Sequence, residues 1–168
     1  MRAARVIPTA LLAGLFLTLP GTLPGIGRLG GPPTAEAATA TSAAEQMLTL
    51  VNAERRKAGC DAVRLDPRLT SAASKHSADM ATNDYFSHTG RNGTGFATRM
   101  EAAGHSTPLS ENIAAGNSTA QATLTRWMDS AGHRRNILDC SAKDMGVGVA
   151  TAPGSTYGIY WTQDFGRG

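Results

Sequence analysis

The chain has 168 residues, of which 41% are hydrophobic and 5% aromatic, and its formal net charge at pH 7 is +3. Three of the 16 basic residues and one of the 13 acidic residues lie in a predicted leader, so the remainder is almost neutral, with 13 basic and 12 acidic residues. This balance excludes the broad basic surface expected of a nucleic-acid-binding domain. The basic clusters at 55–57 and 134–135 are predicted to be solvated surface.

The first 38 residues have the pattern of a secretory signal peptide. Arg2 and Arg5 precede an apolar run at 6–19, and small residues at 35–38 supply an A-x-A cleavage pattern. The run breaks at Pro20-Gly21, before it reaches the roughly 20 residues that a membrane-spanning helix needs. We therefore predict a secreted, extracellular protein without a stable membrane span; an uncleaved anchor is the alternative.

The remaining chain is long enough for one domain with its own core, and it contains two cysteines, Cys60 and Cys140. An isolated even pair in an exported protein most often forms a disulfide. The loop closed by this disulfide would contribute roughly 4.5 kcal/mol in the chain-entropy model. Neither cysteine has the C-x-x-C neighbour of a redox or zinc site, so we predict a structural disulfide.

Residues 39–45 are predicted to be a flexible approach, and helices follow. Ser42 and Glu45 fit a capping box for the first helix, which Gly59 ends. Asp66-Pro67 starts a second helix that ends near Asn83. Its predicted inner face consists of Leu69, Ala72, Ala73, His76 and Met80. A short third helix is predicted over 96–103.

The second half of the chain changes from helices to strands. Residues 105–116 suit a short strand or extended loop, and a fourth helix is capped by Ser118 and ended by Gly132. Alternating residues at 145–150 and 157–165, separated by a turn, predict a terminal hairpin. One face of its first strand carries only Gly and Ala, so another element should lie close against it. The predicted class is α+β with antiparallel strands.

The four histidines are the informative polar residues. His76 lies on the inner face of the second helix and is predicted to be a hydrogen-bonded core residue, whereas His105 is predicted to lie on the surface. His88 comes shortly after an aromatic pair, Tyr85-Phe86, and His133 directly follows Gly132, the predicted end of a helix. Loop residues held by a scaffold often carry function, so these two are the candidates.

Glu111 is the candidate carboxylate, since its polar neighbours and the adjacent Ile113 favour a partly buried, positioned side chain. A carboxylate beside an imidazole can fix its tautomer or act as a general base. Two histidines and a carboxylate can also hold zinc with one position open to water. Serine hydrolysis is disfavoured for Ser87, Ser110 and Ser130, because the chain has no G-x-S-x-G elbow.

Motifs throughout residues 46–165 together resemble a known family. They are L-V-N-A-E-R at 50–55, Asp66-Pro67-x-Leu69, Tyr85-Phe86-Ser87-His88, Ser110-Glu111-Asn112-Ile113, Trp127-Met128-x-Ser130-x-Gly132-His133-Arg134-x-Asn136-Ile137-Leu138, Gly146-Val147-Gly148-Val149 and Trp161-x-Gln163-Asp164-Phe165. In this order they resemble the bacterial branch of the CAP superfamily, the cysteine-rich secretory, antigen 5 and pathogenesis-related 1-like proteins with an SCP domain. The resemblance implies a CAP/SCP-like domain over 46–168.

The resemblance implies a three-layer α-β-α sandwich in which a small antiparallel sheet lies between helices. It also implies a cleft with two histidines and two acidic residues, which binds divalent metal, often zinc, in some members. His88, Glu111 and His133 match three of these positions, and His88 and His133 are the implied metal ligands. Asp129 and Ser130 occupy the turn of the fourth, where the family carries a glutamate, so weakened or absent metal binding is expected.

Three functions are consistent with these residues. We favour a monomeric binding or interaction module whose cleft takes a small molecule or peptide. The cleft is predicted to be lined by His88, Glu111, His133, Asp129 and Ser130. No cofactor is required, although the cleft can also take Zn²⁺ or another divalent cation. The first alternative is a hydrolase of peptide or cell-wall amides that uses Glu111 or metal-bound water, with His88 and His133 as ligands or acid–base partners. The second is a lipid or sterol carrier, for which helix two offers few bulky apolar residues.

Overall fold

The structure is a computed structural model, and it describes residues 35–168, with side chains from residue 43 onward. The predicted signal peptide lies outside the described residues except for positions 35–38. Among the described helices, none is long and apolar enough to cross a membrane.

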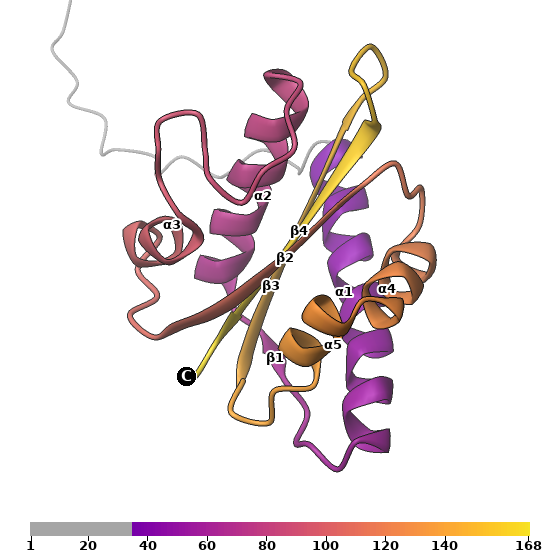
Figure 1. The fold of residues 1–168 in the computed structure, drawn as a ribbon, viewed down its shortest axis with the longest axis vertical. Coiled ribbons are helices and arrows are strands. Elements are labelled where there is room, and N and C mark those ends of the chain that lie inside the picture. Colours follow the sequence, from indigo (N-terminus) through magenta and orange to yellow (C-terminus); the bar gives the residue numbers. More distant parts are fainter. Residues whose placement is uncertain (1–34) are drawn as a thin grey trace, which may run out of the picture. The chain divides into compact units, whose positions relative to one another are not determined.

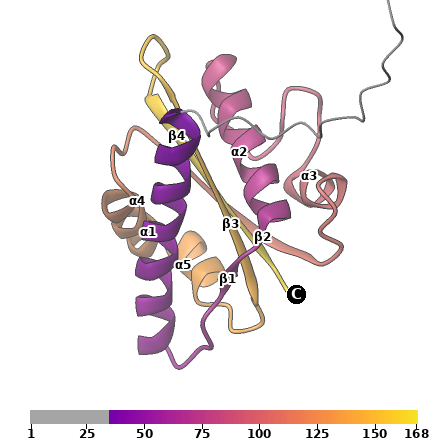
Figure 2. The ribbon, with the colours of Figure 1, turned by 180° about the vertical axis from the view of Figure 1, so that it is seen from behind.

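Within residues 35–168, five helices and four strands form three layers (Figure 1). They are α1 (Ala35–Lys57), β1 (Arg64–Leu65), α2 (Pro67–Thr82), α3 (Phe96–Ala102), β2 (Pro108–Ala115), α4 (Ala120–Asp129), α5 (Ala131–Ile137), β3 (Asp144–Ala152) and β4 (Gly158–Gly166). Helices α2 and α3 cover one side of the sheet, and α1, α4 and α5 cover the other (Figures 1 and 2). The predicted α+β class and three-layer α-β-α sandwich are confirmed.

The sheet has the strand order β1-β3-β4-β2. Strands β3 and β4 form the predicted hairpin, and β2 pairs antiparallel with β4 along the edge. The two-residue strand β1 was not predicted, and it pairs with β3 in parallel. The sheet is therefore antiparallel except at this short edge.

Helix α1 begins earlier than predicted. It starts at Ala35, so residues 39–45, expected to be a flexible approach, are helical. Alanine has the highest helix propensity, and no glycine or proline interrupts 35–58, which explains the extension. Gly59, with a φ of +78°, ends the helix where predicted.

The close contact predicted beside the hairpin is made by α2. A Cβ atom on Gly146 would lie 2.1 Å from the carbonyl carbon of Leu69, and one on Gly148 would lie 2.3 Å from that of Ala73. Asp66 caps α2 by accepting from the amides of Arg68 and Leu69. The predicted inner face of α2 is buried throughout.

The predicted fourth helix is divided into two. Ser130 has an extended backbone, with φ −98° and ψ 121°, and separates α4 from α5. Gly132 therefore does not end a helix, and His133 lies within α5 rather than in a loop. Thr119, not Ser118, caps α4 by accepting from the amide of Ala122.

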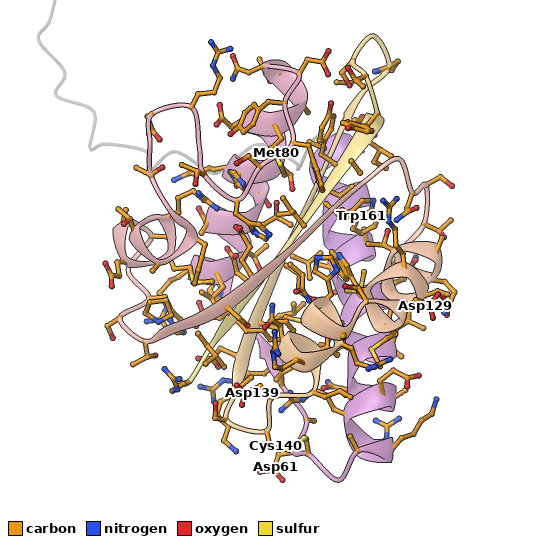
Figure 3. The ribbon with its side chains drawn as sticks, viewed as in Figure 1. Asp61, Met80, Asp129, Asp139, Cys140 and Trp161 are labelled. Atoms are coloured by element: carbon orange, nitrogen blue, oxygen red, sulfur yellow. A yellow bond between two sulfur atoms is a disulfide. The ribbon has the colours of Figure 1, made fainter. Side chains whose placement is uncertain are left out.

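The segment after α5 is tied to the end of α1. Cys60 and Cys140 form the predicted disulfide at the end of the molecule where Figure 3 labels Cys140 and Asp61. Arg55 is fully buried and donates to the carbonyls of Asp61, Ile137, Asp139 and Ala142. The prediction that the whole 55–57 cluster is solvated is thus wrong for Arg55, whereas Arg56, Lys57 and the 134–135 pair are exposed.

Candidate functional site

A cavity of about 350 Å³ lies between the segment after α2, the edge strand β2 and helices α4 and α5. It contains both candidate histidines, and we call it the His88–His133 cavity. Its lining residues are Phe86, Ser87, His88, Ile113, Ala114, Arg126, Trp127 and His133.

The strand side of this cavity is built by side chains that bond to the outer edge of β2. Trp127 Nε1 donates to the carbonyl of Ile113 over 3.0 Å, Arg126 donates to that of Ala115 over 3.3 Å, and Asn136 donates to that of Glu111 over 3.2 Å. These bonds place α4 and α5 against the strand, which brings His133 toward the 85–88 segment.

A buried carboxylate, that of Glu111, orients the ring of His88 through a hydrogen bond. His88 Nδ1 lies 2.7 Å from one oxygen of Glu111, and Arg99 donates to the other oxygen over 2.5 Å. Glu111 is only 5% exposed. Because a carboxylate accepts here, Nδ1 carries the proton, and in the neutral ring Nε2 keeps its lone pair. Arg99 also donates to the carbonyl of His88, which fixes the loop.

A second buried carboxyl group lies beside Glu111. Asp164 is the cross-strand partner of Glu111 on β4 and is 1% exposed. Burial raises the pKa of Asp164 well above its usual range, and the negative charge of Glu111 raises it further. This shift favours the neutral form of Asp164, and Arg99 forms an ion pair with Glu111.

His133 lies on the opposite wall of the cavity. Burial lowers the pKa of His133, and repulsion from His88 and Arg126 lowers it further, which favours the neutral ring. Its main-chain carbonyl accepts from Asn112 over 3.3 Å. His88 and His133 thus line one cavity, whereas Glu111 lies behind His88 and does not line it.

A sequence profile of the CAP family, described as the cysteine-rich secretory protein family, matches residues 48–165. The chain belongs to the CAP family. It is 34% identical over 143 residues to YkwD, an uncharacterized protein of Bacillus subtilis, and 33% identical over 127 residues to YlbC, an uncharacterized membrane protein of the same organism. These matches cover 80% and 74% of this chain but only 54% and 34% of the two relatives.

Solved structures share the same CAP fold. An extracellular protein containing an SCP domain from Bacillus anthracis matches with a TM-score of 0.70 at 30% identity, over 83% of this chain and 45% of that one. An outer surface protein from Borrelia burgdorferi matches with a TM-score of 0.64, over 73% of this chain and 90% of that one. Its 17% identity makes this second likeness one of fold alone.

Two residues placed in the cleft by resemblance to other CAP proteins do not line the cavity. Asp129 is exposed at the carboxyl end of α4 (Figure 3), and Ser130 is half-buried in the break before α5. Arg126 lines the cavity instead.

The possible metal ligands of the His88–His133 cavity fit a divalent cation only in part. The imidazoles of His88 and His133 are suitable ligands, but both oxygens of Glu111 are already hydrogen-bonded, so it orients His88 instead of completing the site. Outside this cavity, the described residues include three side chains of metal-binding type that lie close together. Their ligand atoms all lie within 4.8 Å, and they are Asp66, His105 and Asp144.

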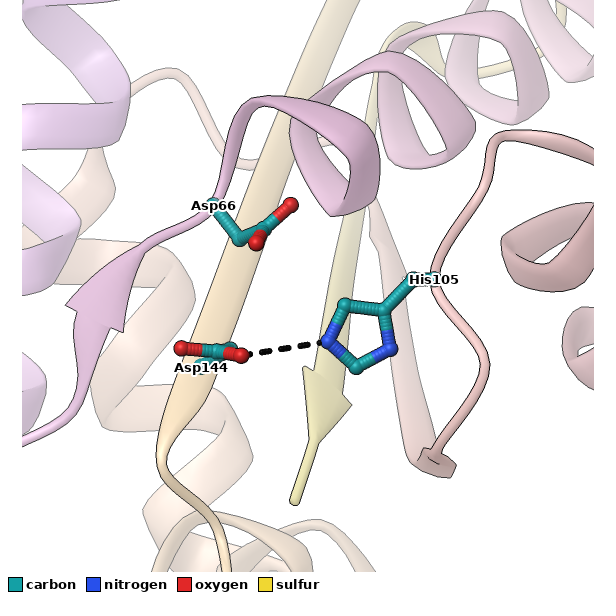
Figure 4. A group of neighbouring side chains, drawn as sticks. All are labelled: Asp66, His105 and Asp144. Atoms are coloured by element: carbon teal, nitrogen blue, oxygen red, sulfur yellow. Dashed lines mark hydrogen bonds and ion pairs between the residues drawn. The ribbon is translucent and has the colours of Figure 1, made fainter. Parts of the chain in front are cut away.

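This second cluster corrects the prediction for His105, which is 1% exposed and not a surface residue (Figure 4). Its Nε2 donates to Asp144 over 3.2 Å, and its ring packs where a Cβ atom of Gly166 would lie. Arg64 donates to the other oxygen of Asp144, and Arg68 donates to Asp66. Both carboxylates are therefore paired with arginines, and His105 links the loop before β2 to Asp144 on β3.

Proposed function

We propose that this CAP protein is a secreted, monomeric binding module whose ligand occupies the His88–His133 cavity. The observation that carries the proposal is the convergence of His88 and His133 on one cavity, with His88 held by a buried hydrogen bond to Glu111. A scaffold that orders an imidazole in this way prepares its free nitrogen for a ligand.

Secretion is supported by three independent features. They are the leader pattern at the amino terminus, the disulfide between Cys60 and Cys140, and the description of the Bacillus anthracis relative as extracellular. Disulfides of this kind persist in oxidising compartments outside the cytosol.

A divalent cation is the proposed auxiliary ligand. His88 Nε2 and the imidazole of His133 would hold it, while Glu111 would fix the tautomer of His88. Because only two protein ligands are on offer, we expect binding weaker than at three-ligand zinc sites, with water or a further ligand group completing the coordination.

Binding is favoured over hydrolysis because of the state of Glu111. A general base needs a free oxygen within reach of the water that it activates. Both oxygens of Glu111 are engaged, and the side chain is buried behind His88. A lipid carrier is disfavoured by the two imidazoles and Arg126 on the cavity wall.

Calorimetric titration of zinc chloride tests the cation. We expect a saturable isotherm with the purified protein, loss of binding in His88→Ala and in His133→Ala, and no change in Asp129→Ala, whose carboxylate is exposed outside the cavity. Equal isotherms for the protein and the double histidine variant would exclude the cation. Loss of binding in Asp129→Ala alone would place the site elsewhere.

A further inference from the structure

We infer that the ligand of the His88–His133 cavity carries a carboxylate beside an apolar side chain, as the carboxyl-terminal residue of a peptide does, and that Arg126 binds this carboxylate. The inference rests on the proposed function and names the class of ligand.

Arg126 is an available cation on the cavity wall. Its side chain is exposed, and one nitrogen donates to the carbonyl of Ala115 over 3.3 Å. Among the described residues it has no ion-pair partner within 4.0 Å, in contrast to Arg64, Arg68 and Arg99. With one terminal nitrogen held by β2, the other terminal nitrogen and Nε form a planar pair of donors. This pair matches the two oxygens of a carboxylate.

The charge around Arg126 favours an anion. None of the described residues that line the cavity is an aspartate or a glutamate. Glu111, which lies behind His88, is buried and paired with Arg99. Negative charge is therefore attracted by Arg126 and opposed by no carboxylate of the wall. A cation bound between the histidines would strengthen this preference.

The apolar part of the ligand is indicated by aromatic residues at the cavity. Phe86 lines the cavity, is 42% exposed, and contacts Tyr157, which is 46% exposed, at a centroid distance of 5.8 Å. Among the described residues, these two are the exposed large hydrophobic side chains. Tyr157 in turn packs against Tyr160. Trp127 and Ile113 contribute further apolar side chains to the cavity wall.

The size of the cavity favours the end of a peptide. A volume of about 350 Å³ is near the lower limit of ligand sites, and suits one or two residues better than a long chain. A peptide terminus brings a carboxylate and a side chain to the same place, as Arg126 and the aromatic residues require.

A matched pair of probes tests this inference. N-acetyl-Ala-Phe with a free carboxylate and the same dipeptide as an amide are titrated into the purified protein, and binding is followed by calorimetry and by chemical-shift changes. We expect the acid to bind about ten-fold tighter than the amide or better, because the charge-assisted bonds to Arg126 are lost in the amide.

Arg126→Gln should abolish the difference between acid and amide, whereas Arg135→Gln, a change at an exposed arginine outside the cavity, should preserve it. Thermal melts of both variants establish that they are folded. Equal binding of the two probes, no binding of either, or a preserved difference in Arg126→Gln overturns the inference. A difference that survives in His88→Ala while zinc binding is lost supports the carboxylate site independently of the cation.

Discussion

Arg55 organises a segment that has no regular secondary structure of its own. Its guanidinium donates to four main-chain carbonyls, of which one lies at the last residue of α5 and two lie between α5 and β3. A buried carbonyl without a partner costs about 1–3 kcal/mol. This one side chain therefore replaces the hydrogen bonds that a helix or strand would supply there.

Arg55→Met tests this role. We expect the free energy of unfolding to fall by about 3 kcal/mol or more, because methionine preserves the buried volume but leaves several carbonyls unpaired. Arg56→Met, at the exposed neighbouring position, should change it by less than about 0.5 kcal/mol. Urea denaturation followed by circular dichroism measures both. Similar losses in the two variants would contradict the assignment.

Asp66 makes stability depend on pH. Its hydrogen bonds with the Arg68 side chain lower the pKa of Asp66 to about 2, with further contributions from the amides of Arg68 and Leu69. Because the pKa is lower in the folded than in the unfolded state, this stabilisation is present above about pH 4 and is lost as the pH falls toward 2. Asp66→Ala should cost about 1–2 kcal/mol at pH 7, as loss of a helix cap does.

Urea midpoints measured between pH 7 and pH 2 check this prediction. The difference between the protein and Asp66→Ala should shrink through that interval, whereas Asp129→Ala, which removes an exposed carboxylate, should follow the unchanged protein. A constant difference at all pH values would mean that the side chain does not act through its charge.

Single residues also show where sequence interpretation stops. The cap at Asp66 and the buried position of His76 follow from neighbouring residues and helical spacing, and both are confirmed. Burial of Arg55 and His105 depends on carbonyls and carboxylates more than 35 residues away in sequence. Local patterns contain no information on such partners, and polar residues are usually exposed.

At the scale of elements, the contact between β3 and α2 leaves no room for a side chain. Gly146→Ala and Gly148→Ala should each destabilise the protein by about 3 kcal/mol or more, because the added methyl groups would meet the main chain of α2 rather than a movable side chain. Gly154→Ala is the matched control, since nothing lies within 4 Å of its added Cβ atom.

Thermal melts and urea titrations of the three glycine variants measure the effect. An unchanged melting temperature in Gly146→Ala would show that α2 can move away from the sheet at little cost. A loss in Gly154→Ala comparable with the other two would instead indicate a general requirement for glycine in the hairpin.

Most helices and strands were predictable from the sequence, but the division between α4 and α5 was not. The apolar spacing from Ala120 to Met128 predicts a helix, and Gly132 predicts its end. The break occurs instead at Ser130, whose extended backbone precedes a new helix that tolerates Gly132. Strand β1 was missed because two residues are too short to show alternation.

The candidate site was predictable through family resemblance rather than through local pattern. His88, Glu111 and His133 come from three separate parts of the chain, and only motifs shared with other CAP proteins connected them. The resemblance could not predict Arg126, because this chain departs from the family pattern at that wall. Burial of Asp164 against Glu111 depends on strand register, which the sequence left open.

At the scale of the whole molecule, the disulfide connects the first helix to the segment before the last hairpin. It closes a loop with a sequence separation of 80 residues. Reduction should lower the free energy of unfolding by about 2–4 kcal/mol. Because Arg55 holds the same segment, the reduced protein should remain folded at 25 °C.

Denaturation with and without reductant, and mass mapping of unreduced peptides, test this prediction. The losses of unfolding free energy caused by Cys140→Ser and Arg55→Met should not be additive in the double variant, because both residues act on one segment. Free thiols in the unreduced protein would contradict the pairing of Cys60 with Cys140.

The bonds from Trp127, Arg126 and Asn136 to the outer carbonyls of β2 have a consequence for behaviour at high concentration. An edge strand with open main-chain groups can recruit a strand from another molecule and begin a cross-β fibril. Here three successive outward carbonyls of the edge strand β2 already accept hydrogen bonds from side chains. The β2 edge of the sheet therefore opposes strand exchange and fibril growth.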